Sequence, residues 1–497
     1  MTRELEPITP QEDGRMNEEP TRERMTRRVF LKAGGVTAAA VGGGALLASV
    51  PLSGATPVAS AATPLQKVGL MASDGFVWLP NIDDPDFGNL TVIPWAPDGP
   101  RGMYNFGFRD QTGRSFTAAV KDAKGNTQFS APFLAFRENA EVQLSLSNAG
   151  FRNRPDIPDG HTVHWHGFRQ ALPLFDGVPE VSVDVPPGHT FVYEYRPRDP
   201  GTFIYHCHWD DVEHVQMGMQ GIVYIQPKQN LGPAIAGFTK FAYNDGNGST
   251  GYNREYSMLL DDLWPLAHID DQHIQDTLWS DYTAQFWTIN GRSYPDTIKP
   301  GWKPVPSAAL PSIPSQDAGL PPVTAFAKGA DDEIRILGSQ PNSSLIQCNG
   351  GDRVLLRFAN LGYQQQSMQL EGIPMKMIGE DANILRGPQT APGAWGVDLS
   401  YFTDTIYIGP GDARDAMFTA PAYAGSGLLD PNILPGNPYD RYMLMNRDLN
   451  RLNNYGHTTS EPGNVVIDGL GGQVTEVRVY RDALPAQALG DYNKTYF

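Results

Sequence analysis

The stretch GTFIYHCHWDDVEHVQMGM (residues 201–219) places one of the two cysteines of this chain between two histidines. No second cysteine stands nearby, so a local disulfide cannot form. Thiolate, imidazole and thioether groups are all ligands of transition metals. The segment therefore predicts a metal site, and its candidate ligands are His206, Cys207, His208, His214 and Met219.

A second group of histidines stands upstream in HTVHWHG (residues 161–167), and it adds the candidates His161, His164 and His166. Six of the ten histidines of the chain thus lie in two short stretches. A single buried histidine or methionine is usually an ordinary core residue. So many ligand types in two neighbouring segments indicate metal binding instead.

Strand parity sorts these residues onto two faces. Side chains alternate along a strand, so His206 and His208 share one face and Cys207 points to the other. His164 and His166 likewise share a face, whereas His161 has the opposite parity. If the two segments are neighbouring strands, one face gathers His161 and Cys207. The other face gathers four imidazoles, those of His164, His166, His206 and His208.

The first face predicts a blue-copper site. Its ligands would be His161, Cys207 and His214, with Met219 as a weak axial ligand. Zinc also accepts cysteine and histidine, but it gains little from methionine. Bound copper keeps a thiolate deprotonated, so we expect Cys207 to be a ligand and not a disulfide partner of Cys348.

The four imidazoles of the second face suit copper in a site that binds a small oxidant. One interpretation is that His164 contributes to a single copper. The remaining three, His166, His206 and His208, would then belong to a coupled pair of copper ions.

The elements that position these residues are predicted to be strands. Glycine (52 residues) and proline (42) are plentiful and charged residues make up only 19%, which favours an all-β protein. GDRVLLRFANLGYQQQSMQLEGI (351–373) repeats the pattern of residues 139–168, and GPGDARDAMF repeats VPPGHTFVYEY. We therefore predict two homologous β-sandwich domains, at 65–230 and 240–490. The second would carry an insertion between Pro300 and Pro341 that contains eight prolines.

HTVHWHG, together with HCH, a following histidine and GM, resembles the multicopper oxidases, which include the laccases and are related to the copper nitrite reductases. The resemblance covers most of the chain after residue 65. It implies two cupredoxin-like Greek-key β-sandwich domains. It also implies one-electron oxidation of a phenolic or aromatic amine reductant, coupled to the reduction of dioxygen to water.

The resemblance also implies a role for each ligand. A type 1 copper would be held by His161, Cys207, His214 and Met219. His164 would bind the type 2 copper, and the type 3 pair would be held by His166, His206 and His208. Electrons would arrive near His214, predicted to be the exposed ligand, and would leave through Cys207 to His206 and His208.

Three other functions stay open. The first is a non-enzymatic blue-copper electron carrier with a degenerate second centre. The second is a nitrite reductase, although His164 would replace its acidic proton donor and Arg447 would fall near its second-domain ligand. The third is oxidation of a low-valent metal ion, which an acidic surface favours.

The second domain departs from the family pattern. A full type 2/type 3 cluster needs about eight histidines, and this domain has Gln366, Gln369 and Glu371 where the first has His161, His164 and His166. We matched His206, Cys207 and His208 with Met443, Leu444 and Met445. Two first domains meeting face to face could supply the missing histidines, which predicts a homo-oligomer.

The four remaining histidines do not fit this pattern. His268 and His273 offer an alternative source of ligands, but we predict them to lie at the surface or in a linker. His189 follows a Pro-Pro-Gly turn and His457 lies in a glycine-bearing loop, so both are predicted to be structural.

The N-terminus predicts export. Arg27–Arg28 precede Phe30, Leu31 and a glycine- and alanine-rich stretch, which is typical of a twin-arginine signal. We expect residues 1–61 to be removed and the mature protein to be periplasmic or extracellular. Residues 33–50 contain five glycines and are barely long enough for a membrane anchor, which we therefore do not expect. The net charge of −17 argues against nucleic acid as a partner.

Overall fold

The computed structural model describes residues 65–80, 102–299, 339–391, 394–431, 433–454 and 470–488. Ala62–Phe497 form one compact unit. The predicted signal region 1–61 lies outside the described residues, as does most of the predicted proline-rich insertion. The predicted domain limits, 65–230 and 240–490, also stay predictions, because the contacts group both parts into the same unit.

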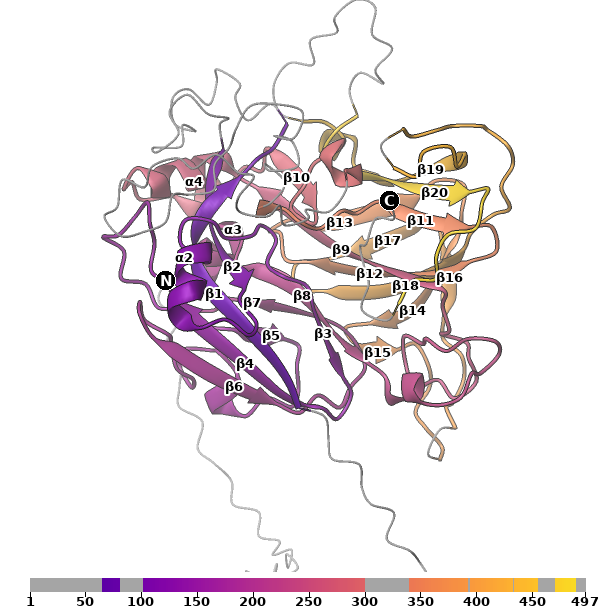
Figure 1. The fold of residues 1–497 in the computed structure, drawn as a ribbon, viewed down its shortest axis with the longest axis horizontal. Coiled ribbons are helices and arrows are strands. Elements are labelled where there is room, and N and C mark those ends of the chain that lie inside the picture. Colours follow the sequence, from indigo (N-terminus) through magenta and orange to yellow (C-terminus); the bar gives the residue numbers. More distant parts are fainter. Residues whose placement is uncertain are drawn as a thin grey trace, which may run out of the picture. The chain divides into compact units, whose positions relative to one another are not determined.

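The first half of the unit consists of two four-stranded sheets that face one another (Figure 1). We call them together the N-terminal sandwich. One sheet has the order β2 (Met103–Asp110), β1 (Leu65–Val77), β4 (Glu141–Asn148), β6 (Thr190–Tyr195). The other has the order β3 (Leu134–Arg137), β8 (Gln220–Gln226), β7 (Gly201–His206), β5 (His164–His166).

A single core fills the space between these sheets. Val142, Leu144 and Leu146 point inward from β4, along which buried and partly exposed side chains alternate. Phe203 and Tyr205 point into the same core from β7. Burial of apolar surface from both sheets holds the sandwich together. The same core contains Cys207 and Met219, so two of the candidate ligands are part of it.

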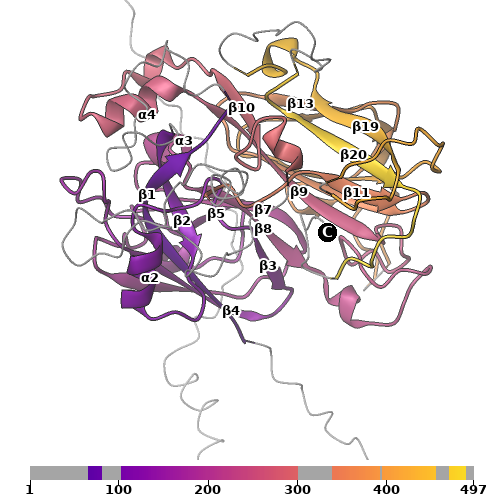
Figure 2. The same ribbon diagram turned by 45° about the horizontal axis from the view of Figure 1, so that its top comes forward.

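The second half also consists of two sheets with a shared core, which we call the C-terminal sandwich (Figure 2). The larger sheet contains β10 (Phe286–Ile289), β9 (Arg254–Leu263), β12 (Arg353–Asn360), β18 (Ala413–Thr419), β14 (Met375–Glu380), β15 (Asn383–Ile384) and β16 (Tyr401–Thr403). The smaller sheet has the order β11 (Ile346–Asn349), β20 (Val474–Tyr480), β19 (Tyr439–Asn446), β13 (Gln366–Leu370), β17 (Thr405–Ile408).

Among the described residues, helices are few and short. The α-helices of this part of the chain are α2 (Phe116–Ala123), α3 (Asp211–Gln216) and α4 (Pro265–Gln272). The 3-10 turns are η2 (Pro173–Phe175), η3 (Lys228–Leu231), η4 (Trp279–Asp281), η5 (Asp296–Ile298) and η8 (Leu449–Arg451). The predicted all-β class is thus confirmed.

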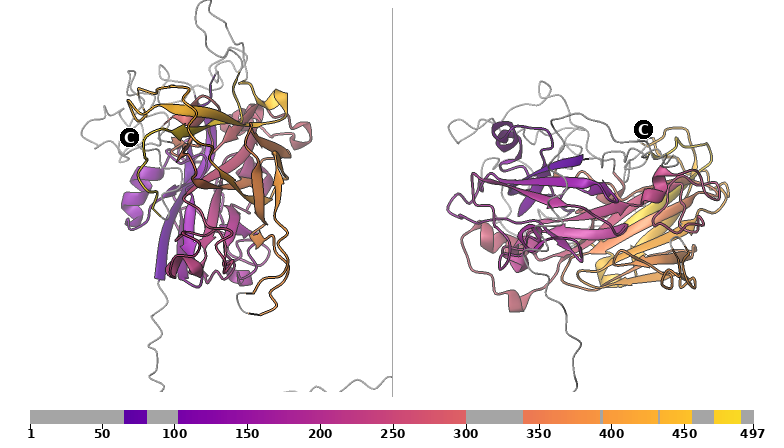
Figure 3. Two further views of the ribbon diagram at one scale, coloured as in Figure 1. Left: turned by 90° about the vertical axis from the view of Figure 1, so that its right-hand side faces the viewer. Right: turned by 90° about the horizontal axis from the view of Figure 1, so that it is seen from below.

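Strands of the two sandwiches meet directly, as β7 contacts β12 and β18, and β8 contacts β9 (Figure 3). A buried charge cluster lies at this contact. Arg357 Nε is 3.0 Å from Glu255 Oε2, and its Nη1 is 3.5 Å from Asp415 Oδ1. Thr202 of β7 donates to the same Asp415 oxygen over 2.6 Å. One strand of the N-terminal sandwich is therefore bound to a buried ion cluster of the other, in which one arginine contacts two carboxylates.

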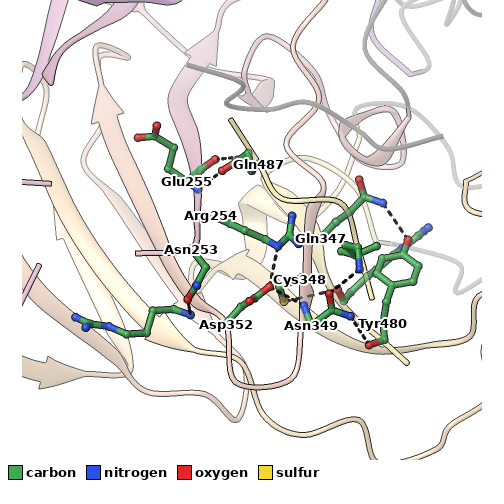
Figure 4. A network of polar contacts seen from close by, with 12 residues as sticks. Asn253, Arg254, Glu255, Gln347, Cys348, Asn349, Asp352, Tyr480 and Gln487 are labelled. Carbon is green, nitrogen blue, oxygen red and sulfur yellow. Dashed lines mark hydrogen bonds and ion pairs between the residues drawn. The ribbon is translucent and has the colours of Figure 1, made fainter. Parts of the chain in front are cut away.

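Cys348 lies in a separate polar network of the C-terminal sandwich, on β11 (Figure 4). Its side chain is fully buried, and Asp352 nearby accepts from Arg254 Nε at 2.7 Å and from Asn349 N at 2.9 Å. Both cysteines of the chain are free thiols. The prediction that Cys207 does not form a disulfide with Cys348 is confirmed.

The buried cluster yields a stability prediction. Arg357→Ala leaves Glu255 and Asp415 as two buried carboxylates without a cation, and we expect a loss of about 3–5 kcal/mol in unfolding free energy. Urea unfolding of the purified protein measures it. Arg481→Ala, at the exposed Arg481–Asp482 pair, is the matched control and should change nothing measurable. Equal stability of the Arg357 variant and the wild type would contradict the prediction.

Candidate metal centres

Cys207 directly follows the last residue of β7, and its side chain is fully buried. Its Sγ lies 3.2 Å from His214 Nδ1 and 3.8 Å from His161 Nδ1. One ligand atom from each of the three residues falls within 4.8 Å of the others, a spacing that could hold one metal ion. Strand parity and the HCH motif therefore predicted the grouping that the structure has.

Contacts of the surrounding backbone fix the positions of the residues in this first centre. His161 pairs with Val185 in an isolated bridge, and Cys207 N donates to Met219 O over 3.0 Å. Asp210 caps the N-terminus of α3, the helix that carries His214. Gly218 follows that helix with φ +113°, and a Cβ there would lie 2.2 Å from the Phe129 ring, so only glycine fits.

The first centre is buried, and two aromatic rings pack against its histidines. The Phe106 ring meets that of His214 edge-on at 5.5 Å, and the Phe151 ring lies 5.4 Å from that of His161. Burial holds the pKa of His161 well below its ordinary value, so the imidazole is neutral and able to bind a metal. Thr162 N donates a hydrogen bond to Cys207 Sγ over 3.4 Å.

His214 differs from our prediction that it is the exposed ligand. Its side chain is 0% exposed, and that prediction is wrong. On the side away from Cys207, His214 Nε2 lies 3.5 Å from Asp159 Oδ2. Although burial lowers the pKa of His214, the nearby Cys207, Asp159 and Glu213 raise it to about 10. Asp159, whose side chain is 27% exposed, separates the imidazole from solvent.

Sequence reasoning missed Asp159. The residue stands two positions before His161, in DGH, and nothing in its spacing marks it as a neighbour of His214. Only the packing of the ligand segments against each other brings the two together. Asp159, Glu213 and His214 also offer ligand atoms within 4.8 Å of one another.

The second group of imidazoles gathers where β5 pairs with β7. His164 lies opposite His206 in this antiparallel pair, and their ring centroids are 5.3 Å apart. The His208 ring lies 5.2 Å from that of His164, and the His166 ring lies 5.7 Å from that of His206. Ligand nitrogens of His164, His166 and His206 fall within 4.8 Å of one another. All four predicted histidines are thus brought together.

Hydrogen bonds orient two of these rings. The Nδ1 atoms of His164 and His206 contact the backbone oxygens of Asp176 (2.7 Å) and Cys207 (2.8 Å). His206 Nε2 is buried and has no hydrogen-bond partner among the described residues. Burial lowers the pKa of His206 to about 3, so its imidazole is neutral. A buried, neutral and unpartnered imidazole nitrogen is the arrangement that a metal ion satisfies.

The two donor sets fit copper. The first combines a cysteine sulfur with two imidazoles and has Met219, whose backbone oxygen accepts from Cys207 N directly before β8, which suits a copper that transfers electrons. The second consists of imidazoles only, which suit a copper that binds a small molecule. That these residues bind copper stays a prediction.

The C-terminal sandwich has a counterpart of the first centre, and β-sheet register identifies it. Gln369 lies opposite Met445 in the β13–β19 pair, as His164 lies opposite His206. Asn446 N donates to Gln473 O, as Cys207 N donates to Met219 O. The counterparts of His161, Cys207 and Met219 are therefore Gln366, Asn446 and Gln473.

This register corrects one part of the sequence analysis. The match of Met443, Leu444 and Met445 with His206, Cys207 and His208 is wrong by two residues, and the matching segment is Met445, Asn446 and Arg447. The expectation that this half lacks copper ligands is unaffected, because none of these side chains is a histidine or cysteine.

The C-terminal half nevertheless reaches the second centre. A cavity of about 250 Å³ lies beside His166 and is lined by Thr202, Asp381 and Asp412, among others. Gly411 has φ +84°, and a Cβ there would lie 2.9 Å from His166 Nε2. The C-terminal sandwich thus contributes a close glycine turn and carboxylates to the surroundings of His166.

The remaining histidines lie away from both centres. His268 is fully buried in α4, with Nδ1 2.5 Å from Tyr104 O, so the prediction that it lies at the surface or in a linker is wrong. His273 and His189 are exposed, and His457 lies outside the described residues. Among the helices that the structure describes, none is apolar and long enough to cross a membrane.

His268 yields a prediction about acid stability. Burial lowers its pKa to about 4, below the value of about 6.5 expected in the unfolded chain. The unfolded chain therefore binds a proton first, and stability is lost as the pH falls from about 6.5 towards 4. His268→Asn keeps a donor for Tyr104 O and should reduce this loss.

Urea unfolding of the metal-free protein at about pH 7 and pH 4.5 measures the effect. His273→Asn, at an exposed position, is the matched control. A pH dependence in the His268 variant as steep as that of the wild type would show that this histidine does not contribute to acid unfolding.

Comparisons with known proteins agree with this arrangement. Residues 112–230 match the family model described as multicopper oxidase. Multicopper oxidase MCE of Talaromyces pinophilus is 36% identical over 108 residues, which are 21% of this chain and 16% of that protein. Laccase 1 of Metarhizium majus is 29% identical over 171 residues, which are 33% of this chain and 23% of that protein. The chain thus matches less than a quarter of the length of these two relatives.

The blue copper oxidase from Nitrosomonas europaea has a similar structure. It covers 84% of this chain and 86% of its own, with a TM-score of 0.50 and 18% sequence identity. At that identity the likeness shows the fold alone, which is the cupredoxin fold.

Proposed function

We propose that this chain, whose residues 112–230 match the multicopper oxidase family model, is a laccase-like copper-dependent oxidoreductase. It couples one-electron oxidation of a phenolic or aromatic amine reductant to reduction of dioxygen to water. The observation that carries the proposal is the position of Cys207 between two donor sets. Its Sγ faces His161 and His214, while the imidazoles of its two neighbours, His206 and His208, belong to the other set.

Each ligand has a proposed role. Type 1 copper is assigned to His161, Cys207, His214 and Met219. Type 2 copper is assigned to His164, and a type 3 pair to His166, His206 and His208. When bound, copper supplies one-electron redox chemistry at the first site and a binding place for dioxygen at the second.

The residues of the chain provide the setting for that chemistry. The Phe106 and Phe151 rings and complete burial exclude water from the Cys207 side chain. The Cys207 backbone links the two donor sets covalently, and its carbonyl oxygen holds His206 Nδ1. This short connection suits transfer of single electrons from one set to the other.

Asp159 is the proposed contact for the reductant. His214 is fully buried, so a substrate cannot touch its ring, whereas the Asp159 carboxylate faces solvent and also reaches His214 Nε2. A phenol O–H or an aromatic N–H can donate a hydrogen bond to this carboxylate. Asp159 would thereby hold the reductant close to the ligand set and accept the proton that an oxidised phenol releases.

The second centre provides evidence that separates the proposed function from the alternatives. A simple electron carrier has no use for four clustered imidazoles and the buried, unpartnered His206 Nε2. A nitrite reductase is disfavoured because His164 stands at the place of its acidic residue, and because Arg447 replaces its second-domain ligand. Oxidation of a low-valent metal ion fits the carboxylates near His214 and remains a further outcome of substrate testing.

A homo-oligomer would complete the second centre. The chain offers four imidazoles there, and the counterparts in the C-terminal sandwich are Gln369, Glu371, Met445 and Arg447. Two N-terminal sandwiches meeting at their histidine faces would supply the eight imidazoles of a full type 2/type 3 cluster. His166 is exposed in the single chain and lies at such a face.

The remaining proposals concern processing and organisation. Residues 1–61 are proposed to direct twin-arginine export to the periplasm or the outside of the cell, and to be removed afterwards. We propose a copper-binding domain at 65–230 and a second domain at 240–490 that lacks copper ligands. The small-molecule reductant and dioxygen are the proposed partners, without nucleic acid or a stable membrane anchor.

Cys207→Ser tests the first centre. Oxygen is a poor substitute for the thiolate, so the variant should lose the intense visible absorption and the narrow paramagnetic resonance signal of type 1 copper, and its oxidase activity. Cys348→Ser is the matched control, because that cysteine is buried and distant from the ligands. Retention of colour and turnover by the Cys207 variant would exclude the proposal.

Copper counting on the purified oligomer tests the second centre. A dimer with two type 1 sites and one shared three-copper cluster should hold about 2.5 copper ions per chain. Oxygen consumption with a phenol should accompany that number. One copper per chain without oxygen consumption would instead identify an electron carrier, and zinc in place of copper would exclude both.

A further inference from the structure

The counterpart of the first centre in the C-terminal sandwich is a cluster of amides. Gln366, Asn446 and Gln473 are each 0% exposed. Asn446 Nδ2 donates to Gln366 Oε1 over 3.0 Å and to Gln473 Oε1 over 2.7 Å. Side chains that hydrogen-bond one another thus occupy the place where the N-terminal sandwich has metal ligands. We call these three residues the amide cluster.

The amide cluster also binds the end of β9. Gln366 Nε2 donates to Asp262 Oδ2 over 3.1 Å, and Gln473 Nε2 donates to the backbone oxygen of Asp261 over 3.1 Å. Fully satisfied buried amides restrict side-chain movement, because breaking any one bond leaves a buried polar group unpaired. The last residues of β9 are therefore fixed by this cluster.

The end of β9 in turn binds the ligand loop, by which we mean residues 208–220. Gln216 Nε2 donates to Asp262 O over 2.9 Å, and Gln216 Oε1 accepts from Trp264 N over 2.8 Å. Gln220 Nε2 donates to Asp261 Oδ2 over 2.8 Å. Both glutamine side chains are fully buried.

These bonds lie close to two of the proposed copper ligands in the ligand loop. Gln216 stands two residues after His214 at the end of α3, and Gln220 stands directly after Met219. The short segment that carries Met219 is thus tied at both ends to the other sandwich. Tyr363, also of the C-terminal half, donates its hydroxyl to Val212 O on α3.

We infer that the C-terminal sandwich positions the type 1 ligand loop, and that the amide cluster is the rigid base of this connection. Gln216 and Gln220 are positioning residues, since they act on the copper through His214 and Met219. The second half of the chain has then kept a role in the copper site of the first half after replacing its own ligands by amides. The inference rests on the proposed type 1 site.

Loosening the ligand loop is expected to change the reduction potential and the spectrum of a type 1 copper. The reduction potential of type 1 copper depends on its axial ligand, and residues behind the ligands fix their orientation. A loop released at Gln216 would let His214 and Met219 move relative to Cys207. A purely structural role would lower stability without changing the copper spectrum, so spectroscopy separates the two.

The test compares copper-loaded full-length variants with the wild type. Gln216→Leu removes both bonds of that side chain, and Gln220→Met removes the bond to Asp261 while keeping the side-chain length. Asn446→Leu disrupts the amide cluster far from the copper. The readouts are the thiolate-to-copper absorption band, the copper hyperfine splitting in paramagnetic resonance, the reduction potential and the rate of copper release to a chelator.

We expect a shifted band, a changed hyperfine splitting and a shifted potential in Gln216→Leu, with copper release about tenfold faster because two hydrogen bonds are lost. Gln220→Met and Asn446→Leu should shift the same quantities by smaller amounts. Gln347→Leu is the matched control, because it removes a buried side-chain bond to Tyr480 in the same sandwich and none of the bonds to Asp261 or Asp262 described above. It should leave the spectrum unchanged.

Two results would overturn the inference. One is a wild-type spectrum in folded Gln216→Leu and Gln220→Met, and the other is an equal shift in the Gln347 control. Either could occur while the wild type shows type 1 copper, in which case the proposed function stands. A wild type without any type 1 spectrum would instead remove the proposed function itself.

Discussion

The alternation of side chains at the end of β7 is the constraint on which both candidate centres depend. Because neighbouring residues of an extended chain point to opposite sides, Cys207 turns into the core while His206 and His208 turn away from it. Pairing with β5 then adds His164 and His166 to the outer side. Two chemically different donor sets arise from one strand end, only a peptide bond apart.

The two sandwiches have diverged in what fills that position. In the N-terminal sandwich it holds a thiol and imidazoles, and in the C-terminal sandwich it holds amides that hydrogen-bond one another. A metal site needs the first arrangement, whereas a stable core favours the second. Amides in place of metal ligands thus remove metal binding and add internal hydrogen bonds at the same position. The buried Arg357 cluster adds a further contact between the halves.

Much of this was predictable from the sequence, because the information is local. The repeat and the separation of the candidate residues into two groups follow from alternation and spacing along one or two segments; the groups are His161, Cys207 and His214, and His164, His166 and His206. The register of the repeat was misplaced by two residues, since Met443 and Met445 resemble the HCH pattern more than Asn446 does. Only hydrogen-bonded pairing between strands settles such a register.

The features that sequence reasoning missed are set by packing between distant segments. The burial of His214 and the closeness of Asp159 depend on how α3 lies against the segment before His161. The burial of His268 depends on α4 lying against β2. No spacing rule reports such contacts, because the residues involved are separated by about 50 to more than 150 positions.

For the proposed oxidase, the complete enclosure of His214 would affect how a reductant delivers its electron. A donor that never touches the imidazole must deliver its electron by tunnelling across the intervening carboxylate, and such a rate falls steeply with separation. Selection among substrates would then follow their driving force and how closely they settle on the surface, more than a complementary shape. In the proposed oxidase, that shielding would allow several donors of similar potential to be oxidised.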